Sequence, residues 1–251
     1  MTEQKENSAN GSIAGVSLGP GDPELITVKG LKLLQQADKV YFPGSRFSDG
    51  RKDSYSLSIL KHYDLDPNKL TGFYLTMSLD RKEAEVLYYD TFLKIKEDYE
   101  NGMNVVVVSE GDASTFSSFS YLLHHFQQHH LPFHIQPGIT SFALAAACHH
   151  LPLAIQNEKM VIIPRIQNED EVVQCLTSYD TVILMKIRSV KTLIFKVLKT
   201  WKAHIFYGER LGTKEEFIST NLEEIEQRDI PYFALLIIKK NDSKRIQNQV
   251  A

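Results

Sequence analysis

The chain has 251 residues, of which 43% are hydrophobic and 24% charged, as in ordinary globular proteins. Its net charge of −3 gives no overall positive field for nucleic acid or an anionic membrane, and no apolar run reaches the roughly 18 residues of a membrane-spanning helix. The two cysteines, Cys148 and Cys175, have no CxxC spacing, so a cytoplasmic protein without nucleic-acid or membrane partners is expected.

The first half of the chain alternates strand-like and helix-like segments. Residues 1–12 are polar and small and predict a disordered tail, followed by a short apolar strand at 13–18. A long amphipathic helix is expected at 82–101 because Gly102 is a natural helix stop, and the run NVVVVS at 104–109 is typical of a buried central strand. Helices are further expected at 27–37, 56–63 and 117–129, and strands at 39–44 and 72–77.

A second alternation starts after residues 129–132. Strands are expected at 133–136, 160–164, 181–187, 204–209 and 232–240, and helices at 141–150, 169–176, 189–200 and 222–228. The pattern predicts two α/β domains with mixed, mostly parallel sheets, one at residues 13–130 and one at 131–251.

Three glycine-bearing turns each follow an expected strand and precede an expected helix. They are GPGDPEL at 19–25, EGDASTF at 110–116 and QPGITSF at 136–142. Ligands of open α/β sheets bind at such strand ends. No lysine follows the glycines as in a phosphate loop, and the third glycine of a dinucleotide fingerprint is absent. Asp112 suits a ribose hydroxyl or a cationic group, so a nucleoside-like ligand is favoured. The alternative is that each aspartate only caps its turn.

The same stretches resemble the signatures of a known family. GVSLGPGDPELITVKGLKLLQQADKVYFPGS, VVVVSEGDASTF and IQPGITSFALAAACHHLPLA, with DTVILMKI and AHIFYGERLGT, follow the order of motifs in the tetrapyrrole methylases. That family methylates uroporphyrinogen and corrin precursors with S-adenosylmethionine. The resemblance implies two α/β domains, an active site in the trough between them, and a homodimer.

The resemblance also implies cofactor-binding residues. In the first domain these are Pro20, Gly111, Asp112 and Thr115, and in the second they are Thr140, Ser141, Met185, Leu211 and Ala234. Two positions depart from the family pattern. Ala113 stands where proline is usual, which restores an N–H group and is expected to loosen the turn, and Ser17 stands where glycine is commoner.

Within the family, the chain is most similar to the subgroup that methylates precorrin-2 at C20, as in VYFPGS, SYSLSIL, FYLTMSLD and GDASTFSSFSYL. A polycarboxylate substrate calls for cations, and Arg46 and Arg51 are the candidates, followed by Lys186, Arg188 and Arg210. Glu110, Tyr207 and Glu209 are candidates for acid/base work, and no other catalytic residue is indicated.

No metal site is expected. His124, His125, His129 and His130 crowd one helix end, but no acidic motif accompanies them, and a surface position is favoured. Any cobalt would arrive within the substrate.

Other functions stay open. A related enzyme could methylate corrin precursors at C11 or C17, and diphthine synthase is a more distant relative. A non-catalytic module that binds a nucleoside or tetrapyrrole is disfavoured because all five motifs occur together.

Overall fold

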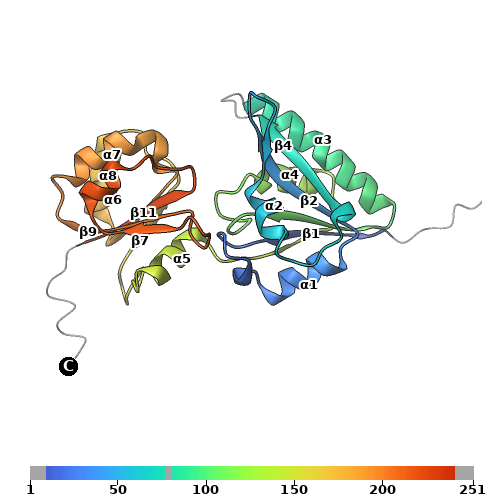
Figure 1. Ribbon diagram of the computed structural model, residues 1–251, viewed down its shortest axis with the longest axis horizontal. Coiled ribbons are helices and arrows are strands. Elements are labelled where there is room, and N and C mark those ends of the chain that lie inside the picture. Colours follow the sequence, from blue (N-terminus) through green and yellow to red (C-terminus); the bar gives the residue numbers. More distant parts are fainter. Residues whose placement is uncertain (1–9, 77–80, 241–251) are drawn as a thin grey trace, which may run out of the picture. The chain divides into compact units, whose positions relative to one another are not determined.

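The computed structural model describes residues 10–76 and 81–240, which divide into two compact units between Thr140 and Ser141 (Figure 1). This confirms the expected α/β class with two sheets. The elements of the first unit are β1 (Ser12–Ser17), η1 (Pro23–Leu25), α1 (Val28–Gln36), β2 (Lys39–Arg46), β3 (Lys52–Asp53), α2 (Tyr55–Leu60), η2 (Pro67–Lys69), β4 (Leu70–Thr76), α3 (Arg81–Glu100), β5 (Asn104–Ser109), α4 (Phe119–Gln128) and β6 (His134–Gln136).

The first sheet is parallel except for one short strand. β5 pairs with β1 and β2, β1 also pairs with β6, and β2 also pairs with β4, all in parallel. Only β3 runs antiparallel, against the end of β2. The carboxyl ends of β4, β2, β5, β1 and β6 therefore meet at one edge of the sheet, where parallel α/β proteins bind ligands.

Alternating residues of the central strands pack against helices on both faces of this sheet. Val105 and Val107 belong to a core with α3 and α4, whereas Val106 and Val108 belong to a second core with α1 and α2. Figure 1 shows α1 and α3 on opposite sides of β1. Burial on both faces explains the uninterrupted valine run of β5.

Both ends of the first unit differ from the expected boundaries. β6 lies beyond residue 130, yet it pairs with β1. At the other end, residues 1–9 of the expected tail lie outside the described residues. Gly11 donates its N–H to the Tyr99 carbonyl, and Ser12 already belongs to β1. Met77, the last residue of the strand expected at 72–77, also lies outside them.

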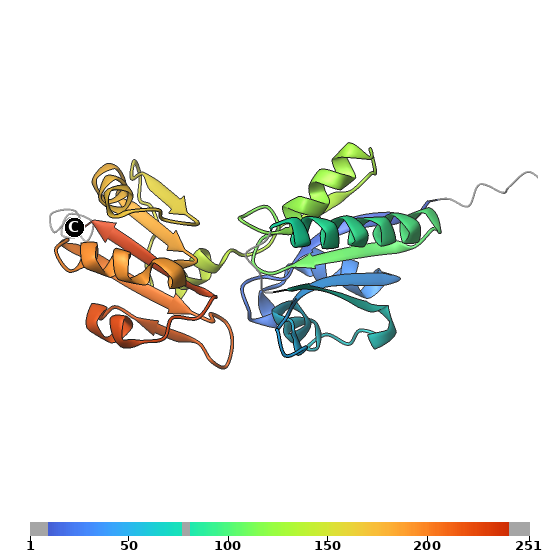
Figure 2. The same ribbon diagram turned by 90° about the horizontal axis from the view of Figure 1, so that it is seen from above.

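The second unit holds a mixed sheet of five strands in the order β10-β9-β11-β8-β7. Figure 2 shows its strands and helices from above. Its elements are α5 (Ser141–Cys148), β7 (Met160–Ile163), α6 (Glu169–Ser178), β8 (Thr181–Met185), η3 (Ile187–Val190), α7 (Lys191–Leu198), β9 (Ala203–Glu209), β10 (Phe217–Ser219), α8 (Leu222–Gln227) and β11 (Ala234–Lys240).

This second sheet is not mostly parallel, in contrast to the expectation. Only β7 and β8 pair in parallel, whereas β8–β11, β11–β9 and β9–β10 are antiparallel. β11 inserts between β8 and β9 and runs antiparallel to both. None of the helices in residues 10–76 and 81–240 is long and apolar enough to cross a membrane.

Candidate active site

The first two glycine turns are joined directly by their backbones. Gly19, after β1, donates its N–H to the Gly111 carbonyl at 3.1 Å and accepts the Gly111 N–H at 2.7 Å. Both glycines have positive φ, +82° and +63°, which a side chain would strain. Pro20 is buried, and its carbonyl accepts the Tyr55 hydroxyl at 3.0 Å. Hydrogen bonds to Gly111 and to Tyr55 therefore hold the turn after β1 in place.

Asp112 joins the second turn to the third. One carboxylate oxygen accepts the N–H of Gly138 at 2.8 Å, and the other accepts the N–H and hydroxyl of Ser114 and, at 3.3 Å, the hydroxyl of Thr115. The residue is 7% exposed. Burial acts to raise the pKa of this carboxyl, but the hydrogen bonds outweigh it and hold the pKa below its ordinary value. The capping interpretation of Asp112 thus fits the geometry, and both oxygens already have protein partners.

The two departures from the family pattern meet in space. The N–H of Ala113 donates to the Ser17 hydroxyl oxygen at 2.9 Å, and both residues are buried. The N–H that alanine restores therefore has an acceptor that glycine at position 17 would not provide. The expectation that Ala113 loosens the turn is wrong, because this hydrogen bond ties the turn after β5 to β1.

We expect Ser17 and Ala113 to be energetically coupled. Ser17→Ala leaves the buried Ala113 N–H unpaired and is expected to cost about 1–3 kcal/mol of unfolding free energy. In an Ala113→Pro background, which has no N–H to satisfy, the same change should cost at least about 1 kcal/mol less. Urea unfolding of the four proteins measures the coupling, with Ser120→Ala on the exposed face of α4 as the control. Additive effects would contradict it.

Glu110 lies at the end of β5, directly before the Gly111 turn. The Ser56 hydroxyl on α2 donates to its Oε1 at 2.5 Å, and Ser56 itself is fully buried. Burial raises the pKa of the Glu110 carboxyl above its ordinary value, although the Ser56 hydrogen bond acts in the opposite direction. The pKa of Glu110 is therefore raised and that of Asp112, two residues later, is lowered. Such a pattern separates a group able to exchange protons, here Glu110, from one held ionised, here Asp112.

Tyr207 and Glu209 are engaged inside the second unit. Tyr207 is fully buried and donates its hydroxyl to Glu209, which is 4% exposed and pairs with the Arg228 guanidinium at 2.5 Å. Burial and the Glu209 carboxylate raise the pKa of the Tyr207 hydroxyl. The Arg228 guanidinium also lies 3.7 Å from the centroid of the Phe217 ring. This closed network does not support the expected acid/base roles of Tyr207 and Glu209.

The remaining cofactor candidates fall into two groups. Met185, Leu211 and Ala234 gather at one edge of the second sheet, since Met185 pairs with Leu235 and Ala234 with Glu209. Leu211 and Ala234 are both buried. Thr140 ends the first unit and Ser141 begins α5, and neither hydroxyl bonds to any part of the chain that the structure describes.

The candidate cations differ in their surroundings. Arg51 pairs with Asp49 of its own loop at 2.7 Å and packs over Phe47, whereas Arg46 ends β2 and is exposed. In the second unit, Arg210 follows β9 and pairs with Glu215. Lys186 and Arg188 follow β8 and are exposed.

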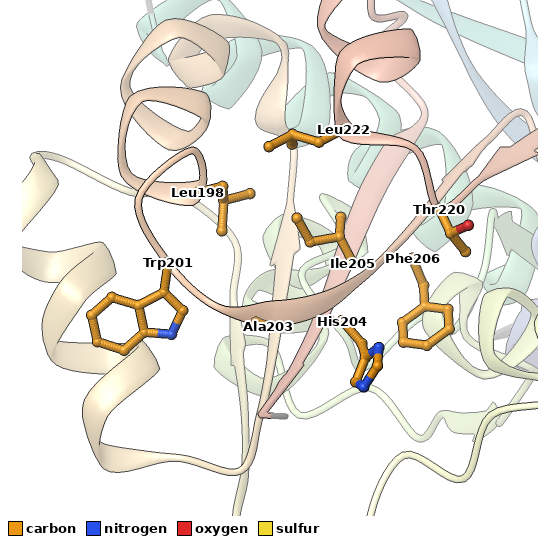
Figure 3. Close-up of a pocket in the computed structure, with 8 residues that line it drawn as sticks. All are labelled: Leu198, Trp201, Ala203, His204, Ile205, Phe206, Thr220 and Leu222. Carbon is orange, nitrogen blue, oxygen red and sulfur yellow. The ribbon is translucent and has the colours of Figure 1, made fainter. Parts of the chain in front are cut away.

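A separate open pocket lies in the second unit (Figure 3). It has a volume of about 480 Å³ and follows the first half of β9 between the ends of α7 and α8. Its polar side-chain groups are the Trp201 indole N–H, the His204 imidazole and the Thr220 hydroxyl. No residue expected at the site lines it, because Glu209, Arg210 and Leu211 lie at the opposite end of β9.

The histidines of α4 pack with aromatic rings. His125 lies 5.2 Å from the Phe92 ring and 5.3 Å from the Tyr89 ring, between centroids. In the described ranges, no three His, Cys, Asp or Glu side chains are grouped so that they could hold a metal ion.

Comparison with known proteins identifies the family. The chain is 30% identical over 237 residues to a cobalt-precorrin-2 C(20)-methyltransferase of Salmonella typhimurium, covering 92% of this chain and 97% of that protein. Two solved structures share the fold. One is a cobalt precorrin-4 methyltransferase of cobalamin biosynthesis, with a TM-score of 0.68, 21% identity and coverage of 91% and 94%. The other is a uroporphyrin-III C-methyltransferase of Thermus thermophilus in complex with S-adenosylhomocysteine, with a TM-score of 0.62, 21% identity and coverage of 91% and 97%. The family described as Tetrapyrrole (Corrin/Porphyrin) Methylases matches residues 12–226, and the chain belongs to it.

Proposed function

We propose that this chain methylates precorrin-2 or cobalt-precorrin-2 at C20, with S-adenosylmethionine as methyl donor, in corrin biosynthesis. The observation that carries the proposal is the similarity to the Salmonella enzyme over nearly the full length of both chains. The three turns at one edge of the first sheet support it, because all three are linked by hydrogen bonds into one structure.

The residues fit a nucleoside-type cofactor. A Cβ at Gly111 would meet no atom within 4 Å, whereas at Gly138 it would lie 2.4 Å from the Ser17 Cβ. The Gly111 backbone is thus open to close approach by a ligand, and the hydroxyls of Thr140 and Ser141 are available as donors. Pro20, Asp112 and Thr115 would hold the turns in place around the cofactor, and Met185, Leu211 and Ala234 would contribute from the second unit. A solved relative contains S-adenosylhomocysteine, which agrees with this cofactor class.

The chain itself would hold the substrate and remove a proton. S-adenosylmethionine supplies an activated methyl group, and the substrate carbon that accepts it must lose its hydrogen. Glu110 is the candidate acceptor, because Tyr207 and Glu209 are engaged in a buried network, and its Oε1 is positioned by Ser56. A carboxyl with a raised pKa can take up a proton and release it to water at neutral pH.

Arg46 is exposed at the same edge of the sheet and would bind substrate carboxylates. Arg51 is not assigned to this role, because Asp49 already neutralises it.

A product analysis tests the proposal. The purified protein is incubated with S-adenosylmethionine and enzymatically made precorrin-2, with and without cobalt inserted, and the product is examined by mass spectrometry and carbon NMR. One added methyl group at C20 is expected. Methylation at C11 or C17 would identify a different corrin methylase, and binding without any transfer would favour a non-catalytic module.

Two further properties belong to the same proposal. The chain would act as a homodimer in the cytoplasm, where reduced Cys148 and Cys175 are stable. Light scattering of the purified protein in solution measures the oligomeric state, and a monomeric mass would contradict the dimer.

A further inference from the structure

Two cations face each other across the short antiparallel ribbon that ends β2. Arg46 of β2 and Lys52 of β3 are directly opposite in register, and both are exposed. Neither forms an ion pair with any Asp or Glu among the described residues, in contrast to Arg51 next to Lys52 in the chain. Like charges directly opposite each other destabilise a strand pair. The strand pair therefore carries a repulsion that no ion pair among the described residues offsets.

An aromatic ring completes this surface. Tyr74 of β4 is paired with Gly44 of β2, and the Lys52 ammonium lies 4.7 Å from the centroid of the Tyr74 ring. A Cβ at Gly44 or Gly72 would lie 2.6 Å from atoms of this ring, so the ring occupies space that only glycine leaves free. Because side chains alternate along a strand, Gly44 and Arg46 share a face, and Lys52 opposite Arg46 lies on it too.

This group, which we name the Arg46–Lys52 patch with Tyr74, lies at the carboxyl ends of β2 and β4 in the first sheet. β2 pairs with β5 only through residues Lys39–Tyr41, and β2 then continues to Arg46. Since the two strands are parallel, this overhang extends in the direction of Glu110 and the open Gly111 turn. The patch and the turns therefore belong to the same edge of the same unit.

We propose that Arg46, Lys52 and Tyr74 form a subsite for the peripheral carboxylates of the macrocyclic substrate. Bound carboxylates would neutralise the two cations, and the partly exposed Tyr74 ring offers an apolar face beside them. The inference rests on the proposed function and assigns substrate binding to Lys52 and Tyr74. It also gives Lys52 a role that the neighbouring Arg51 does not share, because Arg51 is already paired with Asp49.

Lys52→Gln is expected to raise KM for the tetrapyrrole about 5- to 20-fold with kcat nearly unchanged, since a charge that binds substrate and transition state equally is lost. KM for S-adenosylmethionine should not change. Lys52→Arg should retain most of the affinity. Arg51→Gln is the matched control on the same loop and should leave KM within about twofold, as expected for an exposed, self-paired charge.

Thermal unfolding separates this role from a structural one. Removing one of two like charges should leave the melting temperature of Lys52→Gln equal to or above that of the parent protein. An unchanged KM, an equal loss in Arg51→Gln, or a lower melting temperature accompanied by losses for both substrates would overturn the inference.

If the parent protein fails to methylate precorrin-2, the proposed function fails instead. Fluorescence titration with uroporphyrin, a stable polycarboxylate macrocycle, then tests the subsite by itself: weaker binding by Lys52→Gln than by Arg51→Gln supports it, and equal binding refutes it.

Discussion

Replacement of Glu110 by glutamine is expected to lower kcat by about 10²- to 10⁴-fold, the contribution of a positioned proton acceptor. Glutamine has nearly the same shape and keeps an oxygen to accept the Ser56 hydroxyl, so the packing of α2 on β5 should persist. Single-turnover methyl transfer with saturating substrates measures the effect. KM values should change little, since the proton leaves only as the new bond forms.

The pH dependence of activity gives a second, independent signature of Glu110 as the proton acceptor. The parent enzyme should lose activity at low pH as Glu110 becomes protonated. Because burial raises its pKa, the loss should occur above the ordinary glutamate value of about 4.3. Ser56→Ala removes a hydrogen bond that lowers this pKa, so it should move the acid limb to higher pH. Glu110→Gln should have no such limb. A limb that persists in Glu110→Gln would assign it to another group.

The free energy of unfolding should depend on pH in the direction opposite to that of activity. A carboxyl whose folded pKa is raised favours folding fully below its unfolded pKa, and this contribution is lost as the pH rises through the folded pKa. At neutral pH a charged Glu110 therefore costs stability, and Glu110→Gln should unfold at an equal or higher temperature. A variant that loses both activity and stability would indicate a structural role instead.

The sequence predicted the edge of the first sheet because its signals are local. A buried valine run followed by a glycine–aspartate turn marks the end of β5, and GPGDPEL and QPGITSF mark the ends of β1 and β6 in the same way. The contacts between these turns are long-range and could not be predicted. The Ser17–Ala113 hydrogen bond joins residues 96 positions apart, and it reverses the expectation for the alanine.

Strand pairing accounts for the other differences. Lys52 was not a candidate because its position opposite Arg46 depends on the register of β2 and β3. Glu209 is the last residue of an expected strand and was a candidate, but its partner Arg228 lies at the end of a helix 19 residues later. The order of strands in the second sheet also has no local signal, since β11 is last in sequence but inserts between β8 and β9.

Asp112→Asn is expected to destabilise the first unit by about 2–4 kcal/mol and to weaken S-adenosylmethionine binding at least tenfold. The carboxylate accepts N–H groups on both of its oxygens, and an asparagine must turn an NH₂ group toward the N–H of either Gly138 or Ser114. One buried donor then loses its acceptor and faces another donor. If that donor is Gly138, the link between the second and third turns is lost, and if it is Ser114, the second turn itself is loosened. Either change alters the shape of the site without removing any contact to the cofactor.

Urea unfolding and calorimetric titration measure the two effects, with Asp66→Asn as the matched control. Asp66 also accepts a backbone N–H at the start of a short helix, but it lies in an exposed turn away from the site. Its substitution should cost no more than about 1 kcal/mol and leave binding unchanged.

The pKa of Asp112 is lowered in the folded state. Its contribution to the free energy of unfolding is therefore present above the unfolded pKa of about 3.9 and is lost as the pH falls through the folded pKa. The difference in stability between the parent and Asp112→Asn should therefore shrink in strong acid. If Asp112→Asn lost affinity but kept full stability at neutral pH, Asp112 would be a direct ligand of the cofactor rather than the residue that joins the turns.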